Sequence, residues 1–134
     1  MNFLRKRPEV SVILAAYNHE SFVEEAVRSV LNQSYENLEL IIVDDASTDR
    51  TADVVRSFRD PRIRFYQNQY NRQHHPRNYA LSHVRGNWVA FQNSDDVWLQ
   101  DKLSVQLDRF KRRPKQSVVF TDVELIDSEG QIQE

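Results

Sequence analysis

The sequence predicts an α/β domain built on a mostly parallel central sheet, with helices on both faces of that sheet. Short apolar runs alternate with segments whose apolar residues recur at helical spacing, the pattern of strands joined by right-handed helical crossovers. Two of the runs, residues 38–45 (LELIIVDD) and 88–96 (WVAFQNSDD), end in adjacent aspartates. Runs of Leu, Ile and Val are typical of buried parallel strands, and ligands bind at the carboxyl ends of such strands. The aspartates therefore predict a binding site at that edge of the sheet.

The first half of the chain predicts two strand–helix units. Residues 10–14 form the first expected strand, and Ser21 with Glu24 has the spacing of a capping box at the start of the following helix. Residues 38–43 form the second expected strand, and residues 46–51 (ASTDRT) supply side chains that favour a helix start. Both helices are predicted by apolar residues at helical spacing, which are Phe22, Val23, Ala26, Val27, Val30 and Leu31 in one and Val54, Val55 and Phe58 in the other.

The second half predicts three further strands. Residues 62–66 alternate polar and apolar side chains, which indicates a more exposed third strand. Pro76 suits the first position of a helix, and Gly86 suits the position just after a helix end. A fourth strand is expected at residues 88–91 and a fifth at residues 117–121, ahead of a turn with the sequence DSEG. The last helix is marked by Leu103, Leu107 and Phe110 and is ended by Pro114.

Length and composition exclude several classes of protein. The 134 residues suffice for one domain, and a net charge of −2 gives no basic face for nucleic acid. The chain has no cysteine, and hence no disulfide, thiolate zinc site or cysteine nucleophile. Its two glycines, Gly86 and Gly130, cannot form a GxGxxG turn or a glycine-rich phosphate-binding loop. A nucleotide diphosphate would therefore be held by a metal ion and side chains.

Targeting signals are not evident in the sequence. The first ten residues, MNFLRKRPEV, are basic but contain no apolar run of the kind found in signal peptides. No apolar stretch approaches the roughly 20 residues that a membrane-spanning helix needs. These features predict a cytoplasmic domain, which could associate with the inner face of the cell membrane only through regions outside this chain.

The two aspartate pairs predict four carboxylates in one crevice, where a cation or hydrogen-bond donors must offset their repulsion. Hard oxygen ligands suit Mg²⁺ or Mn²⁺, and these ions commonly accompany phosphate groups. Asp95 and Asp96 can bind a metal ion and a sugar hydroxyl, or can lie in a solvated loop or cap the next helix. Asp44 and Asp45 can likewise cap a helix, or accept a hydrogen bond from the ring N–H of uracil or guanine.

Four further side chains each have two interpretations. The adjacent His74 and His75 suggest a metal site, but a polar loop is favoured because adjacent side chains diverge and no third soft ligand is near in the sequence. Arg77, at the start of a predicted helix, can reach a phosphate or a base carbonyl, or lie on the surface. Tyr17 can stack on a base or belong to the core.

Three segments together resemble the nucleotide-sugar-binding portion of a family 2 glycosyltransferase of the GT-A type, a Rossmann-like fold. They are residues 10–18 (VSVILAAYN), 36–51 (ENLELIIVDDASTDRT) and 75–103 (HPRNYALSHVRGNWVAFQNSDDVWLQDKL). The order and spacing of the segments carry the resemblance, which extends over residues 10–123. It implies an inverting enzyme that transfers a sugar from a nucleotide-diphosphate donor, a UDP-sugar, to a glycan or lipid-linked acceptor.

The resemblance implies a role in donor binding for each of five residues. Ala15 and Tyr17 would line the base pocket, with Tyr17 stacked on the base. Asp45 would accept a hydrogen bond from the ring N–H of a pyrimidine. Arg77 would help to hold the base or the phosphates, and Asp95 would contact the ribose or the sugar.

Asp96 is the residue that the resemblance assigns to the metal ion. It would ligate Mn²⁺ or Mg²⁺ between the two phosphates, where the ion acts as a Lewis acid on the departing diphosphate. Family members often have an aspartate in place of Asn93, which implies a weaker metal site here. Glycine is common at the position of Ala46, and Pro76 and Ala80 replace a small residue and a glycine beside Arg77.

Family members also carry a following segment with acceptor contacts and a carboxylate base. We expect that base to lie beyond Glu134 and the 134-residue chain to be inactive alone. A non-catalytic nucleotide-sugar-binding module is the main alternative. A signalling receiver domain is disfavoured, because residues 15–18 (AAYN) lack the acidic pair that a receiver needs there and Thr121 and Asp122 stand where its lysine belongs.

Overall fold

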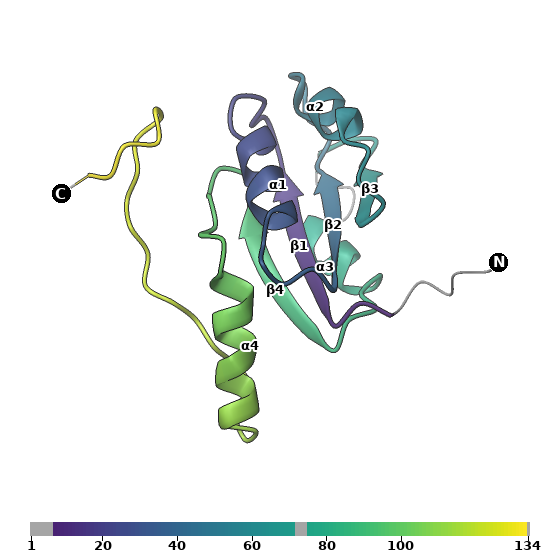
Figure 1. The fold of residues 1–134 in the computed structure, drawn as a ribbon. Helices are drawn as coiled ribbons and strands as arrows, with labels where there is room; N and C mark the ends of the chain where they lie inside the picture. Colours follow the sequence, from purple (N-terminus) through teal and green to yellow (C-terminus); the bar gives the residue numbers. More distant parts are fainter. Residues whose placement is uncertain (1–6, 72–74, 134) are drawn as a thin grey trace.

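Four parallel strands form the sheet, in the spatial order β3-β2-β1-β4 (Figure 1). The computed structural model describes residues 7–71 and 75–133. Because every neighbouring pair runs parallel, all four carboxyl ends lie at one edge of the sheet. The expected parallel sheet is thus confirmed. The strands are β1 (Val10–Ala16), β2 (Leu38–Asp44), β3 (Ile63–Gln67) and β4 (Trp88–Asn93).

Helices cover both faces of the sheet, as the sequence predicts. Alternate residues of β1 point to opposite faces, so Val12 and Leu14 pack with α1, α2 and α4, whereas Ile13 packs with Ala80 and Tyr79 of α3. In Figure 1, α1 lies in front of the sheet and α3 behind it. The helices are α1 (Val23–Leu31), α2 (Thr51–Ser57), α3 (Pro76–Leu81) and α4 (Lys102–Arg112).

The two central strands are the most buried elements of the protein. Every residue of β2 is buried, and only Ala15 of β1 is partly accessible. This burial on both faces explains why these strands read as continuous apolar runs. β3 is an edge strand whose residues are partly exposed, which confirms the expectation of a more exposed third strand.

A buried glutamate joins the strands near the opposite, amino-terminal edge. The Glu39 side chain accepts hydrogen bonds from the Ser11 hydroxyl (2.7 Å), the Arg64 guanidinium (3.1 Å) and the Arg85 backbone N–H (2.8 Å). Arg64 also donates to the carbonyl of His83 (2.6 Å). These bonds connect β1, β2 and β3 with the turn between α3 and β4.

The capping box predicted at Ser21 and Glu24 is wrong. α1 begins at Val23, with Phe22 at the N-cap and no side-chain capping bond. The backbone carbonyl of His19 instead accepts from the N–H groups of Phe22 (3.0 Å) and Val23 (2.9 Å). A backbone carbonyl, in place of the Ser21 hydroxyl, therefore accepts from the free N–H groups at the start of the helix.

The helix-ending role predicted for Gly86 is also wrong. α3 begins at Pro76 as expected, but it ends at Leu81, five residues before the glycine. A Cβ atom at Gly86 would lie 2.6 Å from the backbone nitrogen of Ser11 and 2.8 Å from the carbonyl carbon of Val10. Glycine is required here because the chain passes directly against the start of β1.

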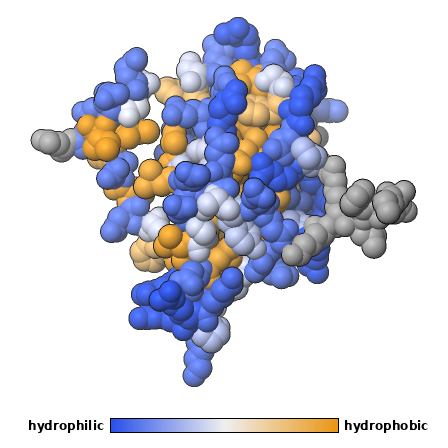
Figure 2. All heavy atoms as spheres, viewed as in Figure 1, coloured by the Kyte–Doolittle hydropathy of each residue, from blue (hydrophilic) through white to orange (hydrophobic). Residues whose placement is uncertain are grey.

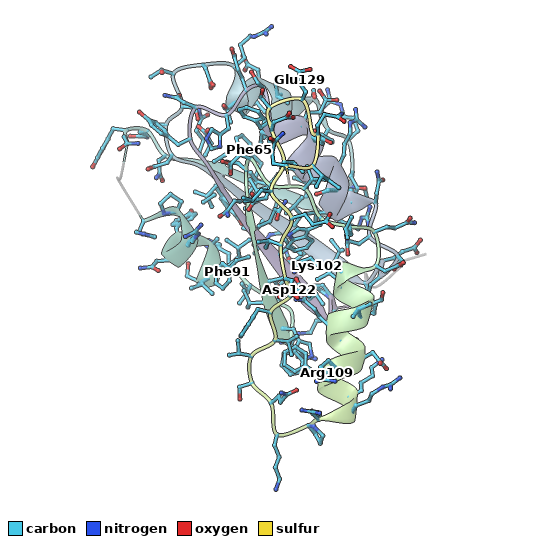
Figure 3. The ribbon with its side chains drawn as sticks, turned by 90° about the vertical axis from the view of Figure 1, so that its left-hand side faces the viewer. Phe65, Phe91, Lys102, Arg109, Asp122 and Glu129 are labelled. Atoms are coloured by element: carbon cyan, nitrogen blue, oxygen red, sulfur yellow. The ribbon has the colours of Figure 1, made fainter. Side chains whose placement is uncertain are left out.

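The predicted fifth strand does not form. Residues 117–121 have no strand partner in the described part of the chain, where the only pairing beyond β4 is a single bridge between Ile126 and Ile132. Val118 and Phe120 are 73% and 88% exposed, so the alternation that predicts the strand buries little apolar surface. Figures 1 and 3 show this segment, in yellow, returning along α4 without joining the sheet, and Figure 2 shows apolar side chains at its surface.

The close approach at Gly86 gives a test of the fold. We expect Gly86→Ala to lower the free energy of unfolding by about 2 kcal/mol in urea denaturation, because backbone atoms must move to admit the methyl group. Gly130→Ala is the matched control, since Gly130 has a positive φ of 77° but a methyl group there would meet no atom within 4 Å. A loss at Gly86 no larger than at Gly130 would contradict the close-approach explanation.

Candidate functional site

A pocket of about 250 Å³ opens at the carboxyl edge of the sheet. It is bounded by the segments that follow β1, β2 and β4 and by the start of α3. The pocket lies at the edge of the sheet where the sequence predicts a binding site, and the ends of three strands border it. The pocket is lined by Ala15, Ala16, Tyr17, His19, Asp45, Pro76, Arg77, Asn93, Ser94 and Asp95.

Asp45 follows β2, lines the pocket and is 8% exposed. One carboxylate oxygen accepts from the Asn68 side-chain amide (2.6 Å), and the other accepts from that of Asn71 (3.2 Å). The Asp45 backbone N–H donates to the carbonyl of Ala16 (2.8 Å), which fixes it against the end of β1. Two amides and the backbone thus orient a carboxylate that borders the pocket.

Asp44 has a different role from its neighbour. It is fully buried and accepts from the Ser47 backbone N–H (3.0 Å), the Ser47 hydroxyl and the Gln67 side-chain amide (3.1 Å). These bonds hold the turn that follows β2. The expectation that all four aspartates face one crevice is wrong, because Asp45 and Asp95 line the pocket whereas Asp44 and Asp96 do not. The donors of Asp44 draw its side chain away from the pocket.

The acidic loop after β4 is linked to α3 through an amide. The Arg77 guanidinium donates to the Asn93 side-chain oxygen (2.8 Å), and the Asn93 amide nitrogen donates to the Asp96 carboxylate (2.7 Å). Asparagine can accept at one atom and donate at the other, whereas an aspartate at this position could only accept. Asn93 therefore holds Asp96 beside Arg77.

The donors available for a metal ion are few. Within residues 7–71 and 75–133, no three side chains of His, Asp or Glu are grouped so that they could hold an ion. Asp95 and Asp96 are both exposed and offer hard oxygen ligands next to the pocket. Such a pair fits a divalent ion only when phosphate oxygens and water complete its coordination. His75 is exposed ahead of α3 and does not line the pocket, and His74 lies outside the described residues.

The loops after β1 and β2 are locked together by polar side chains. Asn18, with φ of 51°, donates its backbone N–H to the Ser47 hydroxyl (3.0 Å) and accepts from the Thr48 N–H (2.8 Å). Ala46 also has a positive φ of 60°, in the region that glycine adopts most easily. The Ala46 backbone thus takes the left-handed conformation even though a Cβ atom disfavours it.

Asp49 anchors the same pair of loops. It accepts from the Glu20 backbone N–H (3.0 Å) and from both the N–H (2.9 Å) and the hydroxyl (2.5 Å) of Thr51. Burial acts to raise the pKa of Asp49, but these hydrogen bonds outweigh it and hold the pKa below its usual value. The carboxylate form therefore fastens the loop of β1 to the start of α2.

Sequence reasoning missed four residues at this site, which are His19, Ser94, Asn68 and Asn71. His19 lines the pocket, with its ring Nδ1 2.7 Å from the Ser94 hydroxyl, and Asn68 and Asn71 orient Asp45. The position of His19, two residues after Tyr17, is a signal that could have identified it. Nothing local marks the two asparagines, because their contact with Asp45 depends on how the polar loop after β3 folds back.

Solved structures with the same sheet identify the class of protein. Residues 1–349 of TarS from S. aureus, solved with UDP and also with UDP-GlcNAc, superpose with a TM-score of 0.73 and 30% identity over 79% of this chain and about a third of that fragment. The mannosyltransferase PcManGT from Pyrobaculum calidifontis, solved with GDP-Man and Mn²⁺, superposes with a TM-score of 0.70 and 31% identity. The match covers 78% of this chain and 33% of that chain. The fold is that of the GT-A class of glycosyltransferases.

The family follows from the sequence comparison. Residues 11–132 match the model of glycosyl transferase family 2, and the chain belongs to that family. WfaP of Escherichia coli, a UDP-Glc:alpha-D-GlcNAc-diphosphoundecaprenol beta-1,3-glucosyltransferase, is 42% identical over 99 residues, which are 73% of this chain and 39% of WfaP. The chain spans about half the length, or less, of the curated relatives it matches. In the described residues, no helix has the length and apolar character needed to cross a membrane.

The different surroundings of Asp44 predict a purely structural effect of its replacement. We expect Asp44→Asn to lower the free energy of unfolding by about 1–3 kcal/mol in urea denaturation, because an amide cannot accept from all the donors now aimed at the carboxylate. Asp53→Asn makes the same chemical change on a side chain that is 76% exposed, and we expect a change within about 0.5 kcal/mol. Equal stability of the two variants would contradict the turn-holding role of Asp44.

Proposed function

We propose that this chain is the donor-binding part of an inverting family 2 glycosyltransferase, which transfers a sugar from a UDP-sugar to a glycan or lipid-linked acceptor. The observation that carries the proposal is the convergence of Tyr17, Asp45, Arg77 and Asp95 on one pocket. These side chains come from three strand ends and one helix start, so only the folded sheet brings them together. The pocket combines an aromatic face, an oriented carboxylate and a guanidinium, which are suited to a base, a ring N–H and phosphates respectively.

The base is held, in this proposal, by the loop after β1 and by Asp45. The Tyr17 side chain is 45% exposed and is free to stack on a base, beside the small Ala15. The Asp45 carboxylate accepts from the N3–H of uracil. TarS was solved with UDP, which supports uracil, although a carboxylate can equally accept from the N1–H of guanine, the base of the GDP-Man bound to PcManGT.

The diphosphate and the sugar lie between α3 and the acidic loop. Arg77 approaches the phosphates, Asp95 contacts the ribose or the sugar, and Asp96 ligates Mn²⁺ or Mg²⁺. The Mn²⁺ in PcManGT supports the use of a divalent ion. When bound, such an ion acts as a Lewis acid that neutralises charge on the departing diphosphate. Asn93 holds Asp96 in place for this contact through the bond described above.

The acceptor is proposed to be a lipid-linked sugar. WfaP is named for transfer to a diphosphoundecaprenol-linked GlcNAc, an acceptor carried by a membrane lipid. A related acceptor for this protein would place its reaction at the inner face of the cell membrane.

Asp45 gives the first test of base recognition. We expect Asp45→Asn to weaken UDP binding about 10- to 100-fold in isothermal titration calorimetry, because a charge-assisted hydrogen bond to the base is lost. The free energy of unfolding in urea, measured for the same variant, controls for the loss of its bonds to Asn68 and Asn71. Titration of the unmodified chain with GDP separates uracil from guanine recognition. A UDP affinity unchanged in Asp45→Asn would remove this residue from the pocket.

The metal assignment predicts a dependence of UDP binding on Mn²⁺. We expect UDP binding to be lost in chelator and restored by Mn²⁺, and Asp96→Ala to abolish this dependence, because two carboxylates alone form a weak site. Asn93→Asp exchanges the hydrogen bond to Asp96 for a further carboxylate ligand, and the apparent Mn²⁺ affinity in the presence of UDP should rise because the ion can then bind both carboxylates. His74→Ala and His75→Ala are the controls and should leave both measurements unchanged. UDP binding that is indifferent to Mn²⁺ would refute the role of Asp96.

A further inference from the structure

His19 is held on several sides in the loop between β1 and α1. Its backbone N–H donates to the Thr51 hydroxyl (2.9 Å), and its carbonyl accepts from Phe22 (3.0 Å) and Val23 (2.9 Å). Its ring lies edge-to-face on Phe22, with centroids 6.1 Å apart and an interplanar angle of 89°. The ring Nδ1 is 2.7 Å from the hydroxyl of Ser94, which also lines the pocket. The imidazole is therefore fixed before any ligand arrives.

The bond to Ser94 determines which ring nitrogen carries the proton. Ser94 is 3% exposed, and among the described residues its hydroxyl bonds to no group except His19. If the imidazole donated, the buried hydroxyl hydrogen would have no acceptor, and an unpaired buried donor is costly. The hydroxyl is therefore the donor, and Nδ1 accepts. A neutral imidazole that accepts at Nδ1 carries its hydrogen on Nε2.

The second ring nitrogen has no such partner. Nε2 makes no hydrogen bond within residues 7–71 and 75–133, and His19 lines the same pocket as Arg77 and Asp95. An imidazole that lines a pocket and has one nitrogen without a protein partner is suited to bind a polar group of a ligand.

Few other groups in the pocket can donate to an anion. Asp45 and Asp95 are acceptors, and Arg77, which spends one N–H group on Asn93 and keeps others for a ligand, is the one cationic side chain that the structure places in the lining. Neither glycine lies in the pocket, so no glycine-rich loop surrounds it with backbone N–H groups. A diphosphate bound here would need side-chain donors, and His19 supplies one on the side of the pocket formed by the β1–α1 loop.

We infer that His19 binds the diphosphate of the donor, with Nε2–H donating to a phosphate oxygen. Ser94 is the positioning residue that fixes the ring and its protonation. The inference rests on the proposed function, because it takes the ligand of the pocket to be a nucleoside diphosphate. It assigns His19 to the phosphates and leaves the base to Tyr17 and Asp45.

The test compares ligands with and without phosphates. Calorimetry with UDP and with uridine, in the presence of Mn²⁺, should show that His19→Ala weakens UDP binding about tenfold and leaves uridine binding unchanged. His19→Gln, whose amide can also donate, should recover part of the UDP affinity. His75→Ala is the control, since it removes an exposed imidazole that does not line the pocket.

The role of Ser94 has its own readout. Long-range ¹H–¹⁵N spectra of the unmodified chain should show neutral His19 protonated at Nε2, and Ser94→Ala should give a mixture of the two tautomers together with weaker UDP binding. A ring protonated at Nδ1 in the unmodified chain would overturn the assignment of the donor.

The outcomes separate this inference from the function it rests on. If the unmodified chain does not bind UDP, both the proposed function and this inference are overturned. If the chain binds UDP and His19→Ala binds it equally well, only the inference fails. A loss of UDP and uridine binding by the same factor would show that His19 shapes the base pocket, which would also overturn its assignment to the phosphates.

Discussion

The structure depends on one constraint, which is that polar groups at the ends of its buried parallel strands need hydrogen-bond partners within the protein. The carboxylates of Asp44 and Asp45, at the end of β2, are 0% and 8% exposed, so most of their hydrogen bonds must come from the protein. Asp44 is satisfied by the turn that follows it, and Asp45 by Asn68 and Asn71 from the loop after β3. The hydrogen bonds that offset the cost of burying these carboxylates also hold the loops after β2 and β3 in place. The loop after β2 forms part of the rim of the pocket, through Asp45.

The scarcity of glycine shapes how that rim can bind an anion. Where many nucleotide-binding folds surround a phosphate with backbone N–H groups, this chain has no glycine in the loops after β1, β2 and β4. Asn18 and Ala46 adopt positive φ in place of glycine, and side chains tie the loops to one another. Recognition of phosphates is consequently left to side chains, among which Arg77 and His19 border the pocket.

The elements that the sequence predicts well are those whose signal is local. The apolar run of β2 and the helical spacing in α1 and α4 reflect burial against the sheet, and the structure confirms them. The predicted strand at residues 117–121 has the same kind of local signal and fails, because a strand also needs the edge of a neighbour to pair with. The helix-ending role predicted for Gly86 is wrong for a related reason. Glycine is required there because of the backbone of Ser11, which is distant in the sequence.

By itself the sequence determined the alternation of strands and helices and the edge at which its aspartates collect, because periodicity and chain order fix both. Tertiary structure decided what each polar side chain does there. Asp44 and Asp45 are adjacent and chemically identical, yet Asp44 is buried against Ser47 and Gln67, whereas Asp45 is held by two asparagines and borders the pocket. His19 meets Ser94 only because β1 and β4 are neighbours in the sheet, although 75 residues separate them along the chain. Contacts of this kind depend on how strands are ordered in space, which no local pattern encodes.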